Sequence, residues 1–383
     1  MATPAAETDP KVRLADLVAR TDAMLEALKE LVAAESPSSD PGAIRFCASV
    51  LAQVGTGLLG VEPEMLDAGR HLHLRWRFGG DAAVPRVLLV GHYDTVWPIG
   101  TAARWPFTVA DGRASGPGIF DMKAGVIQSL FAVAALDDPS GVDLLVTSDE
   151  ELGSTTSQPM IEEMARASVA ALVMEPSRDG KLKVARKGVS FYHLDFKGKA
   201  SHASVPHRGV NALLEMARQV VDLPSIARPE LGTTVTPTLA RAGTAQNTVP
   251  PEAYAYTDVR APSIEEQERV DREIKGLQPH NPEVDIEVSG GPNRPPMPPE
   301  ISAALFDRAV AAARRLGIDL PDEGATVGGG SDGNFTAAVG TPTLDGLGAV
   351  GDGEHAEGEY VEVARMPERA ALLAELIEDL RRG

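Results

Sequence analysis

The pattern of hydrophobic positions along the first half of the chain alternates between two kinds of spacing. Residues 12–34, 44–54 and 124–136 place apolar side chains three or four positions apart, which predicts helices. Short apolar runs, alternating or continuous, predict strands. These runs cover residues 71–76, 87–90, 144–147 and 170–174. Strands and helices that follow one another in this way are typical of an α/β layered sheet.

A different pattern begins near residue 188. An alternating run at 190–196 and a helical pattern at 211–223 precede two strand-like stretches, TTVTPTLARAG and AYAYTDVRA. A charged helix at 264–277 and the run VDIEVSG follow. The order strand, helix, strand, strand, helix, strand is that of a ferredoxin-like α+β sandwich. The segment GGPNRPPMPPE (290–300) is typical of a hinge or linker, because it is rich in Pro and Gly.

The length of 383 residues is sufficient for two domains. Helical spacing returns after the linker, at 303–316. We therefore expect a discontinuous α/β domain with a mixed sheet, made of residues 1–187 and 295–383. A smaller α+β domain, residues 188–294, would be inserted into it.

Composition argues against several classes of protein. The net charge of −19, from 36 basic and 55 acidic residues, argues against a nucleic-acid partner, because a phosphate backbone demands a basic face. The single cysteine, Cys47, can form neither an intrachain disulfide nor a thiolate zinc site, and we expect it to be buried. We see no signal peptide and no apolar run of membrane-spanning length, so we expect a cytoplasmic protein without a membrane partner.

Polar side chains follow the predicted strands directly. GHYDTV (91–96), TSDEELGS (147–154) and MEPS (174–177) each come after an apolar run. GPGIFDMKAG (116–125) is a glycine-rich turn before a helix, and GDGEHAEGEY (351–360) adds a histidine near the C-terminus. Ligands of an α/β sheet bind beyond the carboxyl ends of its strands, so we expect these groups to converge. The candidates are His92, Asp94, Asp121, Glu150, Glu151, Glu175 and His355.

The residue types suit divalent metal ions. Histidines and carboxylates without cysteine are ligands for Zn²⁺, Mn²⁺ or Co²⁺. The three consecutive acids 149–151 would repel one another, and two dications would turn that repulsion into attraction. The acids suffice for two metals about 3.5–4 Å apart with one bridging carboxylate and one base. Singly, each residue has a plainer explanation: a structural histidine, a helix cap at Asp121, or a solvated loop.

Together these motifs resemble the M20 family of metallopeptidases, and especially its glutamate carboxypeptidase (carboxypeptidase G-type) branch. The likeness runs in order through GHYDTV, GPGIFDMKAG, TSDEELGS, MEPS, GKASHASVPHRGVNAL, NTVP, DVR, GGGSDGN and GEHAEGEY. Such an ordered series is more specific than any single motif. It implies a di-zinc peptidase domain with an inserted lid or dimerisation domain, and hence a homodimer.

The resemblance also implies the metal ligands. Asp121 would bridge two divalent ions, most simply Zn²⁺, with Co²⁺ or Mn²⁺ as alternatives. His92 and Glu175 would complete one metal site. Glu151 and His355 would complete the other.

Two further roles come from the resemblance. Glu150, which adjoins a ligand without being one, would be the general base. Asp94 would orient the imidazole of His92. The family often has a cis peptide bond after the bridging aspartate, here between Asp121 and Met122.

Three residues of the inserted domain match positions that the family uses on its substrate. His202 would contact the reacting carbonyl oxygen, commonly from the partner subunit. Asn247 and Arg260 would hold the substrate's carboxylate, for which the planar fork of Arg is suited. The glycines of GGGSDGN would let that loop approach a ligand closely. By residue type alone, all of these could be polar residues in plain loops or at strand ends.

The implied reaction is hydrolysis of the amide before a C-terminal amino acid in a dipeptide, short peptide or N-acyl amino acid. A hydroxide that bridges the metals would attack, with Glu150 as the base. Lys181 stands roughly where glutamate-selective relatives carry a lysine, although its spacing from Glu175 is shorter and a solvated turn would also explain it. The same motifs serve aminoacylases, deacylases and amidohydrolases of other small molecules. A non-catalytic metal-binding protein would predict the loss of Glu150 or of a ligand, and all are present.

Overall fold

The computed structural model describes residues 8–79 and 85–382, and the chain forms two compact units. Unit 1 consists of Met1–Ala185, Pro299–Thr326 and Ser331–Gly383. Unit 2 consists of Arg186–Pro298 and Val327–Gly330. Each unit has its own apolar core, and each is described by itself.

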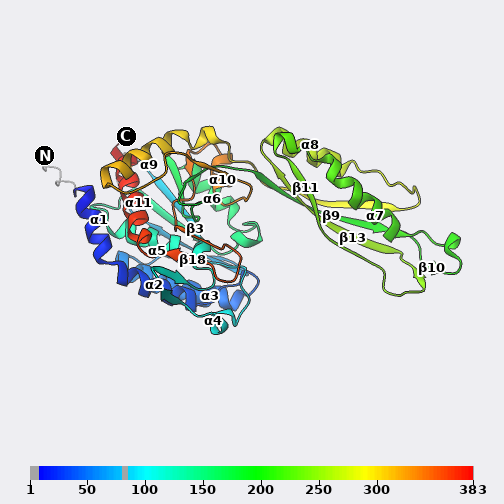
Figure 1. Ribbon diagram of the computed structural model, residues 1–383, viewed down its shortest axis with the longest axis horizontal. Coiled ribbons are helices and arrows are strands. Elements are labelled where there is room, and N and C mark those ends of the chain that lie inside the picture. Colours follow the sequence, from blue (N-terminus) through cyan, green and yellow to red (C-terminus); the bar gives the residue numbers. More distant parts are fainter. Residues whose placement is uncertain (1–7, 80–84, 383) are drawn as a thin grey trace. The chain divides into compact units, whose positions relative to one another are not determined.

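Unit 1 is built around a six-stranded mixed sheet, which confirms the predicted α/β class (Figure 1). In spatial order the strands are β1 (Glu64–Ala68), β2 (His71–Arg77), β6 (Val142–Thr147), β3 (Val87–His92), β7 (Ala170–Val173) and β16 (Thr343–Leu344). β6, β3, β7 and β16 run parallel, whereas β2 is antiparallel to both β1 and β6. β3, β6 and β7 are buried along their whole length, which explains why their sequences are mostly apolar.

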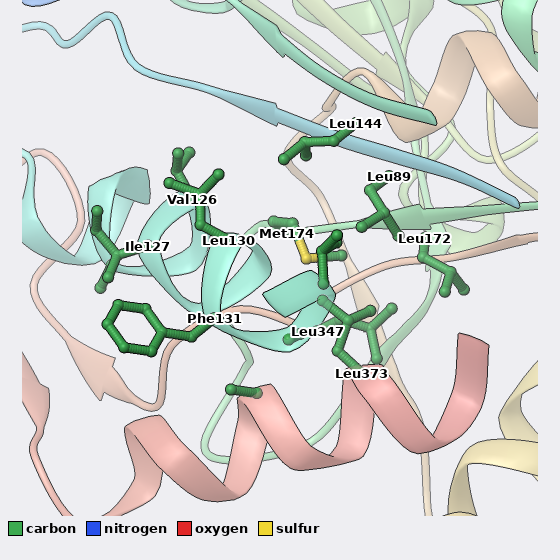
Figure 2. Close-up of a cluster of buried hydrophobic side chains, with 14 of the residues drawn as sticks. Leu89, Val126, Ile127, Leu130, Phe131, Leu144, Leu172, Met174, Leu347 and Leu373 are labelled. Carbon is green, nitrogen blue, oxygen red and sulfur yellow. The ribbon is translucent and has the colours of Figure 1, made fainter. Parts of the chain in front are cut away.

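Helices cover both faces of this sheet. The larger core includes α2 (Thr21–Ala33), α3 (Pro41–Leu59), α5 (Ala124–Ala134), α9 (Ala303–Leu316) and α11 (Arg365–Arg382). Figure 2 shows Leu130 of α5 and Leu373 of α11 in one cluster with Leu89 and Leu172 of the strands. The opposite face packs against α6 (Gln158–Arg166) and α10 (Gly333–Ala338). Burial of each such side chain contributes roughly 1.5–3 kcal/mol, so the strand ends are firmly held.

The remaining strands of unit 1 form small sheets. β17 (Gly351–Asp352), β18 (Tyr360–Glu362), β5 (Arg113–Ser115) and β4 (Thr108–Ala110) lie side by side in that order. β8 (Lys183–Arg186) pairs with β15 (Ala325–Val327), each with its last residue in unit 2, and a short helix of unit 1, α4, covers Thr101–Arg104. The four-stranded sheet brings the C-terminal loop with His355 beside the segment that leads to Asp121.

The apolar pattern over residues 12–34 forms two helices. α1 (Pro10–Ala19) ends at Arg20, and α2 begins at the next residue. α1 packs on α9 and α11, whereas α2 packs on α3 and α5. The two helices thus have different main partners, although α2 also contacts α11, so tertiary packing divides a spacing that is continuous in the sequence.

α3 corrects the expectation that no apolar run approaches membrane-spanning length. It has 19 residues and is apolar enough to cross a membrane by length and composition alone. A single helix of this kind is weak support for a membrane span, because core helices of water-soluble proteins pass the same test. Ile44, Cys47 and Leu51 of α3 are fully buried in the core of unit 1, as expected for Cys47.

Unit 2 is a four-stranded antiparallel sheet with two helices along one face (Figure 1). The strand order is β11 (Thr234–Ala242), β13 (Glu252–Ala261), β9 (Gly188–Lys197) and β14 (Asp285–Arg294). α7 (Ala212–Asp222) follows β9 and α8 (Ile264–Lys275) follows β13, which gives the order βαββαβ. A separate pair is formed by β10 (Ser201–His202) and β12 (Thr248–Val249).

The segment 290–300, expected to be a linker, is strand over its first half. β14 continues to Arg294 and pairs with β9 through Gly290 and Gly291. It is an edge strand, where Pro and Gly are tolerated because only one side carries ladder hydrogen bonds. The pairing becomes irregular only between Pro292 and Arg294. Linker-like composition therefore concealed the end of a strand.

Candidate metal centre

Three neighbouring parallel strands bring polar side chains to one edge of the unit 1 sheet. β3 ends at His92, which is the register partner of Thr147 at the end of β6. The 3₁₀ turn η2 (Glu150–Leu152) follows β6, and Glu175 follows β7. Parallel strands end at the same edge of a sheet, so the side chains that follow them meet there.

Asp121 comes from the glycine-rich turn before α5. Gly118 has a φ of 70°, and a Cβ there would lie 2.4 Å from Thr95 Cγ2, so the turn requires glycine. The Asp121–Met122 peptide bond is cis, as the family resemblance implied. The N-cap residue of α5 is Lys123, without a side-chain cap bond, so Asp121 does not cap the helix.

Two groups of potential ligand atoms share Asp121. His92 Nε2 lies 3.2 Å from Asp121 Oδ1 and 3.6 Å from Glu175 Oε1. His355 Nε2 lies 3.2 Å from Asp121 Oδ2 and 3.1 Å from Glu151 Oε2. Within each group, all ligand atoms lie within 4.8 Å of one another. Each oxygen of Asp121 therefore faces a different histidine.

The two groups differ in exposure. The side chains of His92 and Glu175 are 2% and 9% exposed, at the buried ends of their strands. His355 is 50% exposed and has a φ of 60° in the loop between β17 and β18. One group is thus enclosed by the sheet, and the other is open on the His355 side.

Hydrogen bonds within the cluster determine how its groups bind protons. Burial alone would lower the pKa of His92, but hydrogen bonds to carboxylates, that of Asp121 first, raise it well above the usual value. Hydrogen bonds to Asp121 and Glu151 raise the pKa of His355 to about 11. Burial opposes the ionisation of Asp121, yet the two histidines hold its pKa well below its usual range. The metal-free cluster therefore retains protons that a divalent ion would displace.

We expect the metal-free protein to lose stability as the pH rises from 6.5 toward about 11. Folding raises the pKa of His355, so its stabilising effect is complete below pH 6.5 and is lost as the pH passes through the folded-state value. Thermal unfolding of the chelator-treated protein should show a falling Tm over this range, and His355→Gln should flatten the fall. An equal fall in both proteins would contradict this assignment.

The three consecutive acids have different partners. Glu151 joins one ligand group, whereas Glu150 belongs to neither. Asp149 accepts hydrogen bonds from the backbone N–H and hydroxyl groups of Thr156 and Ser157, at 2.6–3.3 Å. Asp149 is fully buried, so these four bonds replace its hydration. The triplet is therefore not a solvated loop.

Asp94 connects the end of β3 to the loop that carries the three consecutive acids 149–151. It is fully buried, and its Oδ1 lies 3.4 Å from His92 Nδ1. The backbone N–H groups of Glu150 and Glu151 donate to its two oxygens at 3.4 and 3.3 Å. Ser38, which the sequence analysis did not single out, donates its hydroxyl to Asp94 Oδ2 at 2.6 Å.

Asp332, from the GGGSDGN motif, is another buried carboxylate that binds the loop with the three consecutive acids. It accepts hydrogen bonds from the hydroxyl groups of Thr147, at 3.1 Å, and of Ser154. These residues stand at the two ends of TSDEELGS. The sequence suggested a flexible loop for GGGSDGN, whereas Ser331 and Asp332 are buried and bonded.

The predicted Lys181 lies in an exposed turn. Its Nζ is 3.0 Å from Glu323 Oε2, and its role on substrate stays a prediction. Two positions along, Lys183 is buried and its Nζ lies 3.8 Å from Glu175 Oε2. Lys183 thus adds a positive charge to the ligand cluster that sequence spacing did not reveal.

His202, Asn247 and Arg260 belong to unit 2. His202 ends β10, where its Nδ1 is 2.7 Å from Ser204 Oγ, and β10 pairs with the strand that follows Asn247. Arg260 forms a two-pronged pair with Asp258, with Nε–Oδ1 at 2.8 Å and a terminal nitrogen to Oδ2 at 2.7 Å. The guanidinium therefore already has one carboxylate partner.

A cluster of imidazole and carboxylate ligands at the carboxyl edge of an α/β sheet is typical of a metal-dependent hydrolase. The sequence model of peptidase family M20/M25/M40 matches residues 88–379. Carboxypeptidase G2 from Pseudomonas sp. (strain RS-16) is 34% identical over 78% of this chain and 74% of its own. The chain therefore belongs to the M20 peptidase family and is a hydrolase.

Other relatives extend the likeness over more of the chain. A succinyl-diaminopimelate desuccinylase from Cereibacter sphaeroides (strain ATCC 17025 / ATH 2.4.3) is 30% identical over 87% of this chain and 96% of its own. The solved structure of an M20 family metallo-carboxypeptidase from Sulfolobus solfataricus matches 94% of this chain and 99% of its own, with a TM-score of 0.73 and 17% identity. At that identity the structural likeness shows the shared fold.

Proposed function

We propose that the protein hydrolyses the amide bond before a C-terminal amino acid in a dipeptide, a short peptide or an N-acyl amino acid. The observation that carries the proposal is the shared carboxylate of Asp121, whose two oxygens face His92 and His355 in two separate ligand groups. An ordinary surface carboxylate would not contact two histidines at once, one buried and the other half exposed. In a chain of this family, the arrangement supports a two-metal hydrolytic site.

The donor set fits two divalent ions, best Zn²⁺, with Co²⁺ or Mn²⁺ as alternatives. Each group offers one imidazole nitrogen and two carboxylates and no thiolate. His92 and Glu175 would hold one ion, Glu151 and His355 the other, and Asp121 both. When bound, such ions act as Lewis acids that polarise a carbonyl group and lower the pKa of a water molecule.

Glu150 is the general base in this proposal. The backbone N–H groups of Glu150 and Glu151 are fixed by hydrogen bonds to Asp94. Glu150 is therefore held next to the ligand Glu151, and it belongs to neither ligand group itself. Its carboxylate takes the proton of the attacking water and then delivers it to the leaving amine. Asp94 also holds His92 Nδ1, with its backbone carbonyl oxygen at 3.0 Å and its carboxylate Oδ1 at 3.4 Å, which leaves Nε2 directed at the ligand group.

The inserted domain (188–294), which lies within unit 2, acts as the lid or dimerisation domain of a cytoplasmic homodimer in this proposal. His202 would donate to the developing oxyanion, from the partner subunit. Asn247 and Arg260 would hold the substrate's carboxylate. Because Asp258 already occupies one side of the guanidinium, the carboxylate would bind the remaining N–H groups of Arg260.

The substrate's C-terminal residue would be recognised by charged groups beside the ligand cluster. Glutamate is a candidate, and its side chain would need a cation near the ligand cluster. Lys181 was predicted for this role, and Lys183, buried against Glu175, is a second candidate. Deacylation of N-acyl amino acids is the alternative reaction, favoured by desuccinylases that match over nearly their whole length.

The test is a release assay on metal-reconstituted protein with a panel of dipeptides and N-acyl amino acids. We expect free amino acid from substrates of one C-terminal residue type, and none from the Glu150→Gln variant. Cleavage of N-acyl amino acids without cleavage of dipeptides would establish the deacylase instead. Absence of both release and bound metal would refute the proposal.

A further inference from the structure

The turn that carries Asp121 and the loop that carries His355 are joined by a buried carboxyl group, that of Glu359. Its Oε1 accepts hydrogen bonds from the backbone N–H groups of Gly118 and of Ile119, the latter at 3.1 Å. A third donor, Trp97 Nε1, lies 3.2 Å from the same oxygen. Glu359 is fully buried.

These contacts lie close to both ligands along the chain. Glu359 stands four residues after His355, and Ile119 stands two residues before Asp121. A further hydrogen bond joins the same two segments, because Ser115 Oγ donates to the backbone carbonyl oxygen of Glu359 at 2.8 Å. The Glu359 side chain thus fixes the distance between two segments that are 241 residues apart.

The loop is shaped around this residue. Gly353 has a φ of 92°, and a Cβ there would lie 2.8 Å from Glu359 Cα. The second carboxyl oxygen of Glu359, Oε2, is buried without a hydrogen-bond partner among the residues that the structure describes. A buried oxygen without a partner is unfavourable for folding, so stability alone does not account for a glutamate here.

The side chain of His355 is weakly anchored. It is half exposed, and among residues 8–79 and 85–382 its ring pairs with Asp121 and Glu151 of the ligand group. A metal site binds tightly only when its ligands are fixed before the ion arrives. The contacts of Glu359 provide that fixation for the open ligand group.

We propose that Glu359 is a positioning residue, which sets the separation of Asp121 and His355 and thereby the metal affinity of the group that contains both. This inference rests on the two-metal function proposed above. It assigns the effect to the shape of the side chain, because Oε1 accepts the three hydrogen bonds of the carboxyl group and Glu359 belongs to neither ligand group.

Two mild substitutions separate shape from charge. Glu359→Gln keeps an oxygen at the position of Oε1 and cannot ionise. Glu359→Asp keeps an ionisable carboxyl group but is one methylene shorter, by about 1.5 Å, so its oxygens cannot reach all three N–H groups. The same two changes at Glu357, which is exposed on the same loop, are the matched controls.

The measurement is calorimetric titration of metal-free protein with Zn²⁺ alone, with thermal unfolding of each variant as a check of folding. We expect Glu359→Gln to bind two ions within about 3-fold of the unmodified protein, and Glu359→Asp to bind one of them about 10–100-fold more weakly. The Glu357 variants should bind both ions normally. Excess Zn²⁺ should restore the activity of Glu359→Asp.

Three results would overturn the inference: unchanged affinity in both variants, weakened binding in Glu359→Gln with normal binding in Glu359→Asp, or equal losses in both. The last two would assign the effect to charge or to general disruption. If the unmodified protein bound no Zn²⁺, the proposed two-metal function would fail, which is a separate result.

Discussion

Glu150→Gln should lower kcat by about 10²–10⁴-fold and leave both metal ions bound. The amide has nearly the same size as the carboxylate but cannot accept a proton. Glu150 belongs to neither ligand group, and its hydrogen bond to Asp94 comes from the backbone N–H, which the substitution keeps. Steady-state kinetics and metal content per chain measure the two effects separately.

Substitution of the neighbouring Glu151 should have a different effect from substitution of Glu150. Glu151→Gln should reduce metal content as well as kcat, because Glu151 contacts His355 within a ligand group. Glu163→Gln, an exposed glutamate on α6, is the control for the chemical change alone. Loss of a metal ion from Glu150→Gln would show that Glu150 is a ligand, and the assignment of the base would be wrong.

Asp121→Asn should remove both ions, whereas Glu175→Gln should remove one. Asp121 is the only residue shared by the two ligand groups, each oxygen facing a different histidine. An amide offers one oxygen and no charge, so it cannot serve both sides. Activity should fall to that of the chelator-treated protein.

Metal content after dialysis, measured by elemental analysis, decides this prediction. The expected stoichiometries are two for the unmodified protein, one for Glu175→Gln and none for Asp121→Asn. Asp16→Asn, an exposed position on α1, is the control. Retention of one ion by Asp121→Asn would mean that Asp121 serves a single site.

The central strands could be predicted because their burial is visible in the sequence. β3, β6 and β7 are covered on both faces, so most of their positions are apolar, and the polar residues of the site gather where the strands end. Boundaries that depend on packing partners could not be predicted in this way. The break at Arg20 and the continuation of β14 to Arg294 are set by contacts with elements far away in the chain.

The same distinction applies to the site. Motifs indicated which residues lie near the carboxyl edge, because a strand end fixes their position. They did not reveal the partners of the buried carboxylates. Asp149 and Asp332 bind hydroxyl groups, and Glu359 binds backbone N–H groups 240 and 241 residues away. An acidic residue in a polar loop looks solvated until the fold shows what surrounds it.

The unequal exposure of the two ligand groups has a kinetic consequence. An ion held by His92 and Glu175 would have two nearly buried ligands, whereas one held by His355 would have a half-exposed ligand that water can replace. We therefore expect the ions to exchange in sequence, with the His355 side first. A short treatment with a chelator should leave one ion behind, and refilling with a second metal would give a protein with a different ion in each group.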